Sequence, residues 1–217
     1  MSETENDSSN QKLNEFNYDL FLEDTQILQE KKELDLILDK IKVIFSKEKR
    51  KFINLKLIYT ATNDGDSAED FHLHCDGYAP LIILIKTTKN VVFGGFTEKP
   101  FYSTKKRIGN KDDNAFIFSV DRMKTYEVEK GTIATCSFRD YGPVFAGFEH
   151  NNIYLFDDFF TDPGNVAEKG DRFRTTENYE INLGEEKFFV EEMEIYQVLF
   201  NEEKDVKEEK KVNLKNL

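Results

Sequence analysis

The sequence predicts an α+β fold that is mainly β, namely a two-sheet antiparallel β-sandwich with flanking helices and an N-terminal amphipathic helical segment. Two observations support this prediction. After Phe52, short apolar stretches are separated by turn residues, which is typical of antiparallel strands rather than of alternating βα units. Before Phe52, apolar residues recur at every seventh position, which is a helical period.

Eight strands are predicted where apolar runs lie between turn residues: 55–60, 81–86, 91–96, 115–120, 132–138, 144–148, 153–156 and 188–199. The polar turn at 87–90 predicts a hairpin between the second and third strands. Gly94 and Gly95 lie inside the third strand, where paired glycines indicate a bulge or a close approach by another backbone. A phosphate-binding loop would instead lie between a strand and a helix.

The heptad stripe before Phe52 consists of Leu13, Leu20, Ile27, Leu34 and Ile41. It widens towards its end, which favours one or two helices packing on the domain's own sheet. A coiled coil that pairs with itself or with a partner is the alternative, and both interpretations stay open. In the second case the narrower part of the stripe supplies the candidate partner-binding residues, Leu13, Leu20 and Ile27. The basic run 47–51 is expected to end the helix.

A shorter helix is predicted between Asp64 and Asp76. Ser67 fits the N-cap position, and Asp70 lies three residues further on as its capping partner. Phe71 and Cys75 then share the buried face. The expected organisation is a disordered tail at 1–11, the amphipathic segment at 12–51, one domain at 52–200 and a charged tail at 201–217.

The net charge of −12 disfavours binding to nucleic acid or to an anionic membrane surface. The apolar runs are far shorter than the roughly 20 residues that span a bilayer. The acidic N-terminus lacks the basic and apolar regions of a secretory signal, so a cytoplasmic protein is expected. In that reducing compartment Cys75 and Cys136 would stay as thiols, and we interpret both as core residues.

No catalytic, metal-binding or cofactor-binding residue is predicted. His72, His74 and Asp76 are metal-ligand types, but helix residues two positions apart face different directions, so His74 cannot join a chelating pair. A reactive thiol needs a nearby base and an electropositive setting, which neither cysteine shows. The acidic clusters at 112–113, 157–158 and 191–194 are interpreted as solvated surface.

A series of short motifs, taken in order, resembles the TLDc domain family, found in the oxidation resistance proteins and their relatives. The residues that carry the resemblance include Gly65, Ser67, Phe71, Cys75, Gly94, Gly95, Phe116, Phe118, Gly142, Pro143, Phe145 and Glu194. Two positions depart from the family pattern. Phe101 stands where the family usually has Trp, and Ala146 stands where it tends to have Gly.

The resemblance implies a β-sandwich without a catalytic centre or cofactor. It also implies a link to protection from oxidative stress and to binding of the vacuolar proton-ATPase (V-ATPase). The leading hypothesis is therefore a non-catalytic protein-binding and regulatory module. A structural component of a larger assembly, such as a cytoskeletal array, and a thiol-based antioxidant enzyme using Cys75 or Cys136 are the alternatives.

Overall fold

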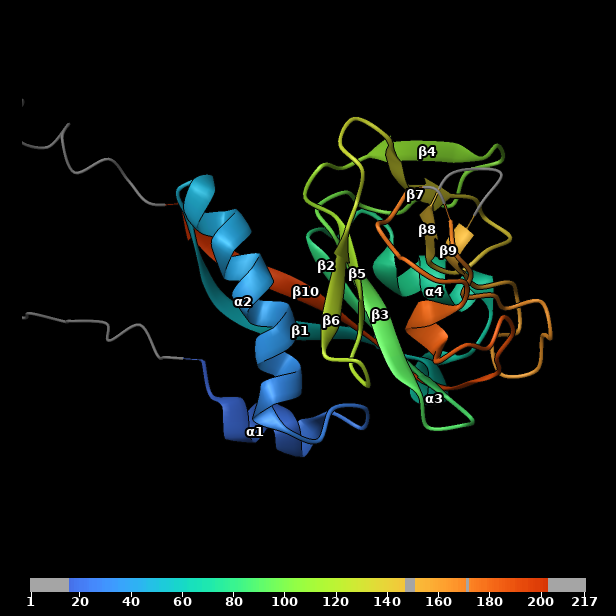
Figure 1. Ribbon diagram of the computed structural model, residues 1–217, viewed down its shortest axis with the longest axis horizontal. Helices are drawn as coiled ribbons and strands as arrows, with labels where there is room; N and C mark the ends of the chain where they lie inside the picture. Colours follow the sequence, from blue (N-terminus) through green and yellow to red (C-terminus); the bar gives the residue numbers. More distant parts are fainter. Residues whose placement is uncertain (1–15, 147–150, 171, 203–217) are drawn as a thin grey trace, which may run out of the picture.

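The computed structural model of the protein describes residues 16–146, 151–170 and 172–202. Its strands form two antiparallel sheets, which confirms the predicted fold class (Figure 1). The six-stranded sheet contains, in spatial order, β1 (Arg50–Thr60), β10 (Val190–Glu202), β2 (Leu81–Thr87), β3 (Val92–Thr97), β5 (Phe116–Ser119) and β6 (Lys124–Glu127). The four-stranded sheet contains β4 (Ile108–Lys111), β7 (Ile133–Ser137), β8 (Val144–Ala146) and β9 (Asn151–Tyr154).

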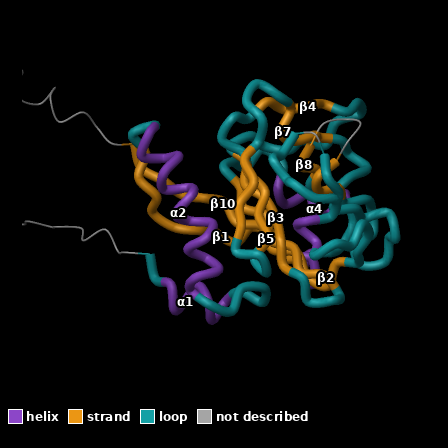
Figure 2. The backbone as a smooth tube through the Cα atoms, in the orientation of Figure 1, coloured by secondary structure: helices purple, strands orange, loops and turns teal. Residues whose placement is uncertain are grey.

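The six-stranded sheet is the middle layer of the molecule (Figure 2). Alternate residues of β2 show this arrangement. Ile83 and Ile85 lie in the core shared with the four-stranded sheet, whereas Ile82 and Leu84 lie in a second core beneath helix α2 (Lys31–Lys47). Because successive strand residues face opposite sides, a strand covered on both faces appears in the sequence as an unbroken apolar run.

Helix α2 packs on the domain's own sheet. Leu34, Ile37, Leu38, Ile41 and Phe45 are each at most 1% exposed and contribute to the core beneath this helix. The wide part of the heptad stripe therefore belongs to the domain core, as the first of the two interpretations predicted. It is not available for pairing with another chain.

The heptad stripe does not form one continuous helix. Helix α1 (Tyr18–Asp24) ends at Thr25, whose backbone is extended, and α2 begins at Lys31 with Glu30 as its N-cap. The prediction that 47–51 forms the basic end of the helix is wrong beyond Lys47. Residue 49 has a positive φ of 57°, which turns the chain into β1.

Helix α4 (Ala68–Cys75) confirms the predicted capping box. The Ser67 side chain accepts a hydrogen bond from the backbone N–H of Asp70, and the Asp70 side chain accepts one from the backbone N–H of Ser67. Phe71 and Cys75 are fully buried on the predicted face. The short helix α3 (Ala61–Asp64) lies between β1 and α4.

Strands β4 and β6 were missed because neither has an apolar run. β4 contains Gly109 and Asn110 and pairs with β7, while β6 is a short edge strand with one fully buried side chain, Tyr126. The predicted strand 144–148 is described only as far as Ala146, and its last two residues lie outside the described residues. Within the described part of the chain, no helix is both long and apolar enough to cross a bilayer.

A buried carboxylate holds the 3-10 turn η1 (Glu180–Asn182) against β6. The Lys124 ammonium donates to the Glu180 Oε1 at 2.6 Å, and the Thr176 N–H donates to Oε2 at 2.8 Å. Burial alone would raise the pKa of Glu180, but the hydrogen bonds from Lys124 and Thr176 outweigh it and lower the pKa to about 2.

Replacing Glu180 with glutamine is expected to flatten the acid limb of the stability profile. A carboxyl whose pKa is lowered by folding stabilises the protein above its unfolded value of 4.5, and this contribution is lost as pH falls towards 2. Urea midpoints measured between pH 7 and pH 2 would show a smaller acid loss for Glu180→Gln. An unchanged pH slope would contradict the assigned role of this carboxylate.

Candidate functional site

Both thiols are buried. Cys75 is fully buried and Cys136 is 4% exposed. Removal from water raises the pKa of the Cys75 thiol, and the carboxylates of Asp76 and Asp64 raise it further. Burial also raises the pKa of Cys136, although Arg107 acts in the opposite direction. Since the thiolate is the reactive species, this setting weighs against a thiol-based mechanism.

The His72–Asp76 pair lines a hollow of about 480 Å³ beside α4. The Nδ1 atom of His72 lies 2.6 Å from the Asp76 carboxylate, and its Nε2 atom lies 3.0 Å from the carbonyl oxygen of Phe138. Both ring nitrogens lie close to oxygen atoms of the chain itself and the His72 side chain is only 5% exposed, so the ring has little access to a substrate. The Nδ1 atom of His74 lies 2.8 Å from the backbone carbonyl oxygen of Asp70. Among the described residues, no three ligand-type side chains are placed to hold a metal ion.

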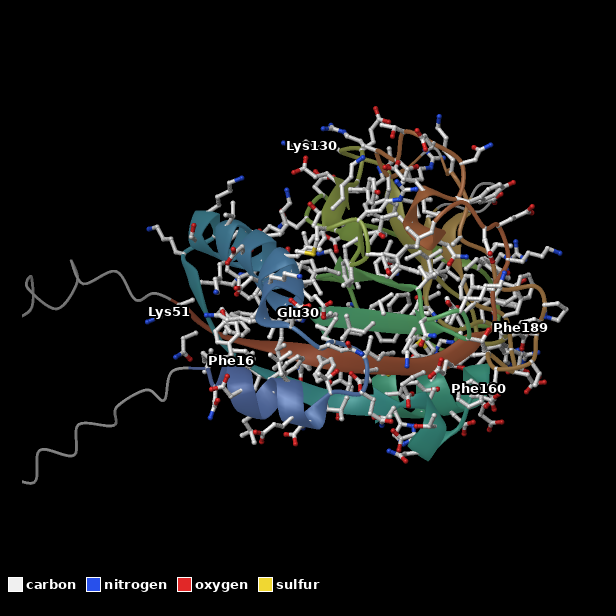
Figure 3. All side chains as sticks on the ribbon, turned by 60° about the horizontal axis from the view of Figure 1, so that its bottom comes forward. Phe16, Glu30, Lys51, Lys130, Phe160 and Phe189 are labelled. Carbon is white, nitrogen blue, oxygen red and sulfur yellow. The ribbon has the colours of Figure 1, made fainter. Side chains whose placement is uncertain are left out.

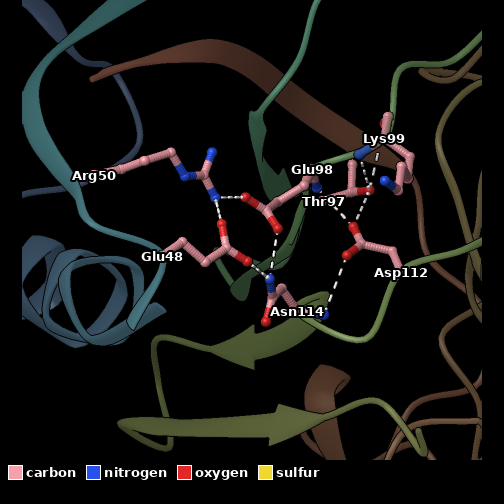
Figure 4. Close-up of polar contacts among 7 residues, drawn as sticks. All are labelled: Glu48, Arg50, Thr97, Glu98, Lys99, Asp112 and Asn114. Carbon is pink, nitrogen blue, oxygen red and sulfur yellow. Dashed lines mark hydrogen bonds and ion pairs between the residues drawn. The ribbon is translucent and has the colours of Figure 1, made fainter. Parts of the chain in front are cut away.

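A polar network fixes the corner between α2 and β1 (Figure 4). The Arg50 guanidinium lies between the rings of Phe45 and Phe200, at 4.2 and 4.5 Å from their centroids, and forms ion pairs with Glu48 and Glu98. The Asn114 amide also donates to both of those carboxylates. Glu98 lies in the loop before β4 and Asn114 in the loop before β5, so the network ties the start of β1 to both loops.

Three carboxylates that were interpreted as solvated surface are buried, so that interpretation is wrong for them. Asp112 is 4%, Glu192 3% and Glu194 1% exposed. Each accepts hydrogen bonds from neighbouring backbone or hydroxyl groups, which offsets the cost of burial. The alternation of acid and apolar residues along β10 resembles a half-exposed strand, but other segments cover its polar face.

Glu194 fastens the loop between α1 and α2 to the sheet. Its carboxylate accepts from the Thr25 hydroxyl at 2.5 Å, from the Gln26 N–H at 2.7 Å and from the Tyr196 hydroxyl at 2.8 Å. The Phe21 ring of α1 packs on the Tyr196 ring with centroids 5.1 Å apart. Together these contacts hold α1 in a defined position over the sheet.

Between α1 and β1 lies a groove of about 940 Å³, which we call the α1–β1 groove. Residues from both elements line it, and Tyr196 of β10 contributes to it as well: Phe16, Asn17, Leu20, Phe21, Asp24, Ile53, Asn54, Leu55, Leu57 and Tyr196. Figure 3 shows Phe16 and Lys51 at the same end of the molecule. The Phe16 ring contacts the Phe52 ring there, with 5.4 Å between centroids. The lining combines large apolar side chains with two polar ones, Asn17 and Asn54, and one charged residue, Asp24.

A family model described as the TLDc domain matches residues 22–199, which is most of the chain. The chain belongs to the TLDc domain family. The resemblance carried by the sequence motifs is therefore confirmed. The matched span includes α2 as well as both sheets.

Two relatives are similar to the chain over a short stretch. TBC1 domain family member 24 of Xenopus tropicalis and the protein of the same name from Xenopus laevis are each 44% identical to the chain over 55 residues. That stretch is 25% of this chain and 10% of each relative. The similarity therefore covers only about a tenth of those proteins.

Five of the twelve TLDc motif residues lie in the two cores. Phe71, Cys75 and Phe145 belong to the core between the sheets, and Phe116 and Phe118 belong to the core beneath α2. Gly94 and Gly95 lie in β3, Gly65 and Ser67 precede α4, Gly142 and Pro143 precede β8, and Glu194 lies in β10.

The two departures from the TLDc pattern are both buried. Phe101 packs against the rings of Phe71 and Phe145, with centroids 5.5 and 6.4 Å away. The phenylalanine ring occupies the position where the family usually has the larger tryptophan ring. Ala146 has a φ of 153°, within the range that favours glycine. This conformation accounts for the glycine that the family tends to have there.

The three candidate partner-binding residues have different environments. Leu20 is 53% exposed and lines the α1–β1 groove, whereas Ile27 is 3% exposed in the core beneath α2. Leu13 lies outside the described residues. A partner contact at these positions remains a prediction. The groove itself was not predicted, because it depends on α1 lying beside a strand that follows some thirty residues later.

Proposed function

We propose that this TLDc domain is a non-catalytic protein-binding module that regulates a larger assembly, with the V-ATPase as the partner. The observation that carries the proposal is the contrast between the interior and the surface. The thiols are buried and the His72 ring nitrogens are engaged, whereas the α1–β1 groove exposes apolar side chains. A groove that exposes large apolar side chains on a folded domain is typical of a protein interface.

The family supplies the partner in this proposal. The resemblance of this sequence to the TLDc family implies a link to the V-ATPase and to protection from oxidative stress. The net charge of −12 agrees with a protein partner rather than with nucleic acid or an anionic membrane surface. Burial of Cys75 and Cys136 weighs against direct thiol chemistry as the source of that protection.

Affinity capture tests the proposed partner. The tagged 217-residue chain would be incubated with cell lysate at low salt, with and without ATP, and the bound proteins identified by mass spectrometry. We expect V-ATPase subunits to be enriched over a control protein of equal size and similar negative charge. If no subunit is enriched in either nucleotide condition, the V-ATPase is not the partner.

A further inference from the structure

The α1–β1 groove exposes two large apolar side chains, one on each wall. Leu20 on α1 is 53% exposed and Leu57 on β1 is 45% exposed, although both are large apolar side chains. Phe16 and Leu55, also in the lining, are partly buried against the core beneath α2. Exposed leucines on the two walls of a groove gain little from packing within the chain, so they are available to a partner.

Helix α1 itself is negatively charged, although the ammonium groups of Lys31 and Lys42 lie near the ring of its Tyr18. Helix α1 carries three exposed carboxylates, Asp19, Glu23 and Asp24, and no basic residue in its last turn. Within the described part of the chain, no ion pair neutralises any of the three. Lys56 of β1 lies between Leu55 and Leu57 in sequence, so strand alternation directs it to the opposite face of the sheet. A ligand with basic residues fits this side of the groove.

The edge of β1 is poorly suited to an added strand. Its pairing with β10 has register shifts between Phe52 and Asn54 and between Leu57 and Tyr59. The Asn54 side chain accepts the Leu55 N–H at 2.8 Å, and Lys56 is exposed. Irregular pairing and edge lysines are features by which proteins prevent strand addition. An extended peptide would therefore find few regular backbone partners here.

The dimensions of the groove suit a short helix. One wall runs from Phe16, just before α1, to Asp24 at the end of α1, and the other runs from Ile53 to Leu57 on β1. At helical and strand rises these spans are about 12 and 13 Å, which is the length of roughly two turns of α-helix. An amphipathic helix binds such a groove through apolar residues at i and i+3 or i+4.

We infer that the α1–β1 groove binds a basic amphipathic helix of a protein partner. Two large apolar side chains on successive turns of that helix pack between Leu20 and Leu57. Lysine or arginine residues on its flank face Glu23 and Asp24. This inference rests on the proposed protein-binding function, but it does not depend on which assembly supplies the helix.

A pair of labelled peptides tests the inference. The first is a 14-residue helical peptide with Leu on one face and Lys on the other, and the second has Glu in place of every Lys. Binding of each to the full chain is followed by fluorescence anisotropy. The lysine peptide is expected to bind more tightly than the glutamate peptide.

Two variants locate the binding site, and circular dichroism melting confirms that each is folded. Leu20→Ser with Leu57→Ser is expected to weaken binding of the lysine peptide about tenfold or more. Leu73→Ser is the matched control, because Leu73 is 77% exposed on α4, outside the α1–β1 groove. Glu23→Lys with Asp24→Lys is expected to reverse the preference, so that the glutamate peptide binds more tightly.

Three results would overturn the inference. The first is equal binding of the two peptides to the wild-type chain. The second is lysine-peptide binding that survives Leu20→Ser with Leu57→Ser, since this would show general attraction to a protein of charge −12. The third is self-association that the same variant abolishes, since this would assign the groove to a second copy of the chain.

The two proposals can fail separately. If the groove variant still captures V-ATPase subunits from lysate, the proposed partner stands and the groove is not its binding site. If the wild-type chain binds the lysine peptide at the groove but captures no V-ATPase subunit, the groove stands and the partner is another assembly.

Discussion

Replacing Gly94 with alanine is expected to lower the free energy of unfolding by about 3 kcal/mol. A Cβ atom at this position would lie 1.9 Å from the backbone carbonyl oxygen of Ile83 and 2.8 Å from the Phe118 ring. Both distances are well below the contact distance of about 3.5 Å. The carbonyl cannot move away easily, because β2 is paired with β3 on one side and with β10 on the other. Chemical denaturation followed by circular dichroism would measure the loss.

Gly109→Ala is the matched control for Gly94→Ala. A Cβ atom there would meet Ile133 at 2.6 Å, but the three nearest atoms all belong to the side chain of this partly buried residue and none to the backbone, so the side chain can shift. The expected loss is about 1 kcal/mol or less. If Gly94→Ala is no more destabilising than Gly109→Ala, the close approach of β2 and β3 is not what requires glycine.

Ile41→Asp is expected to destabilise the whole domain by about 4 kcal/mol or more. Ile41 is fully buried in the core beneath α2, where the loss of the apolar side chain alone costs roughly 2–5 kcal/mol. A carboxylate introduced into this apolar core also adds a desolvation penalty. Thermal melting and size-exclusion chromatography, carried out together, would measure the effect.

Val43→Asp is the control on the opposite face of the same helix. Val43 is 51% exposed, so its replacement is expected to change stability by about 0.5 kcal/mol or less. A melting temperature that is unchanged in Ile41→Asp, together with a changed elution volume, would mean that α2 serves association rather than the core.

The sequence was sufficient to predict the strands with apolar runs and the capped helix. Ile82, Ile83, Leu84 and Ile85 form an unbroken run that requires cover on both faces of β2, and the structure has that cover. Ser67 and Asp70 determine the start of α4 through contacts between residues three positions apart. Local patterns of this kind depend on few long-range contacts, so they can be read without knowledge of the fold.

Features that depend on distant residues could not be predicted. The stripe of apolar residues gave no reason for a break at Thr25, because the break is stabilised by Glu194, which lies 169 residues further along the chain. The same contact buries the carboxylate of Glu194, which the sequence pattern assigns to the solvated surface. Edge strands such as β4 lack an apolar run, since they are defined by backbone pairing with a neighbour rather than by side-chain burial.

The pairing of β1 with β10 has a consequence for synthesis of the protein. Residues 50–60 leave the ribosome long before residues 190–202, yet the two strands are hydrogen-bonded along most of their length. Contacts between residues so far apart in sequence form late, because they require a long loop to close. Helices α1 and α2 can be anchored fully only once Glu194, Tyr196 and Val198 have been added. The α1–β1 groove therefore exists only on a chain translated through β10, so an incomplete chain cannot present this surface.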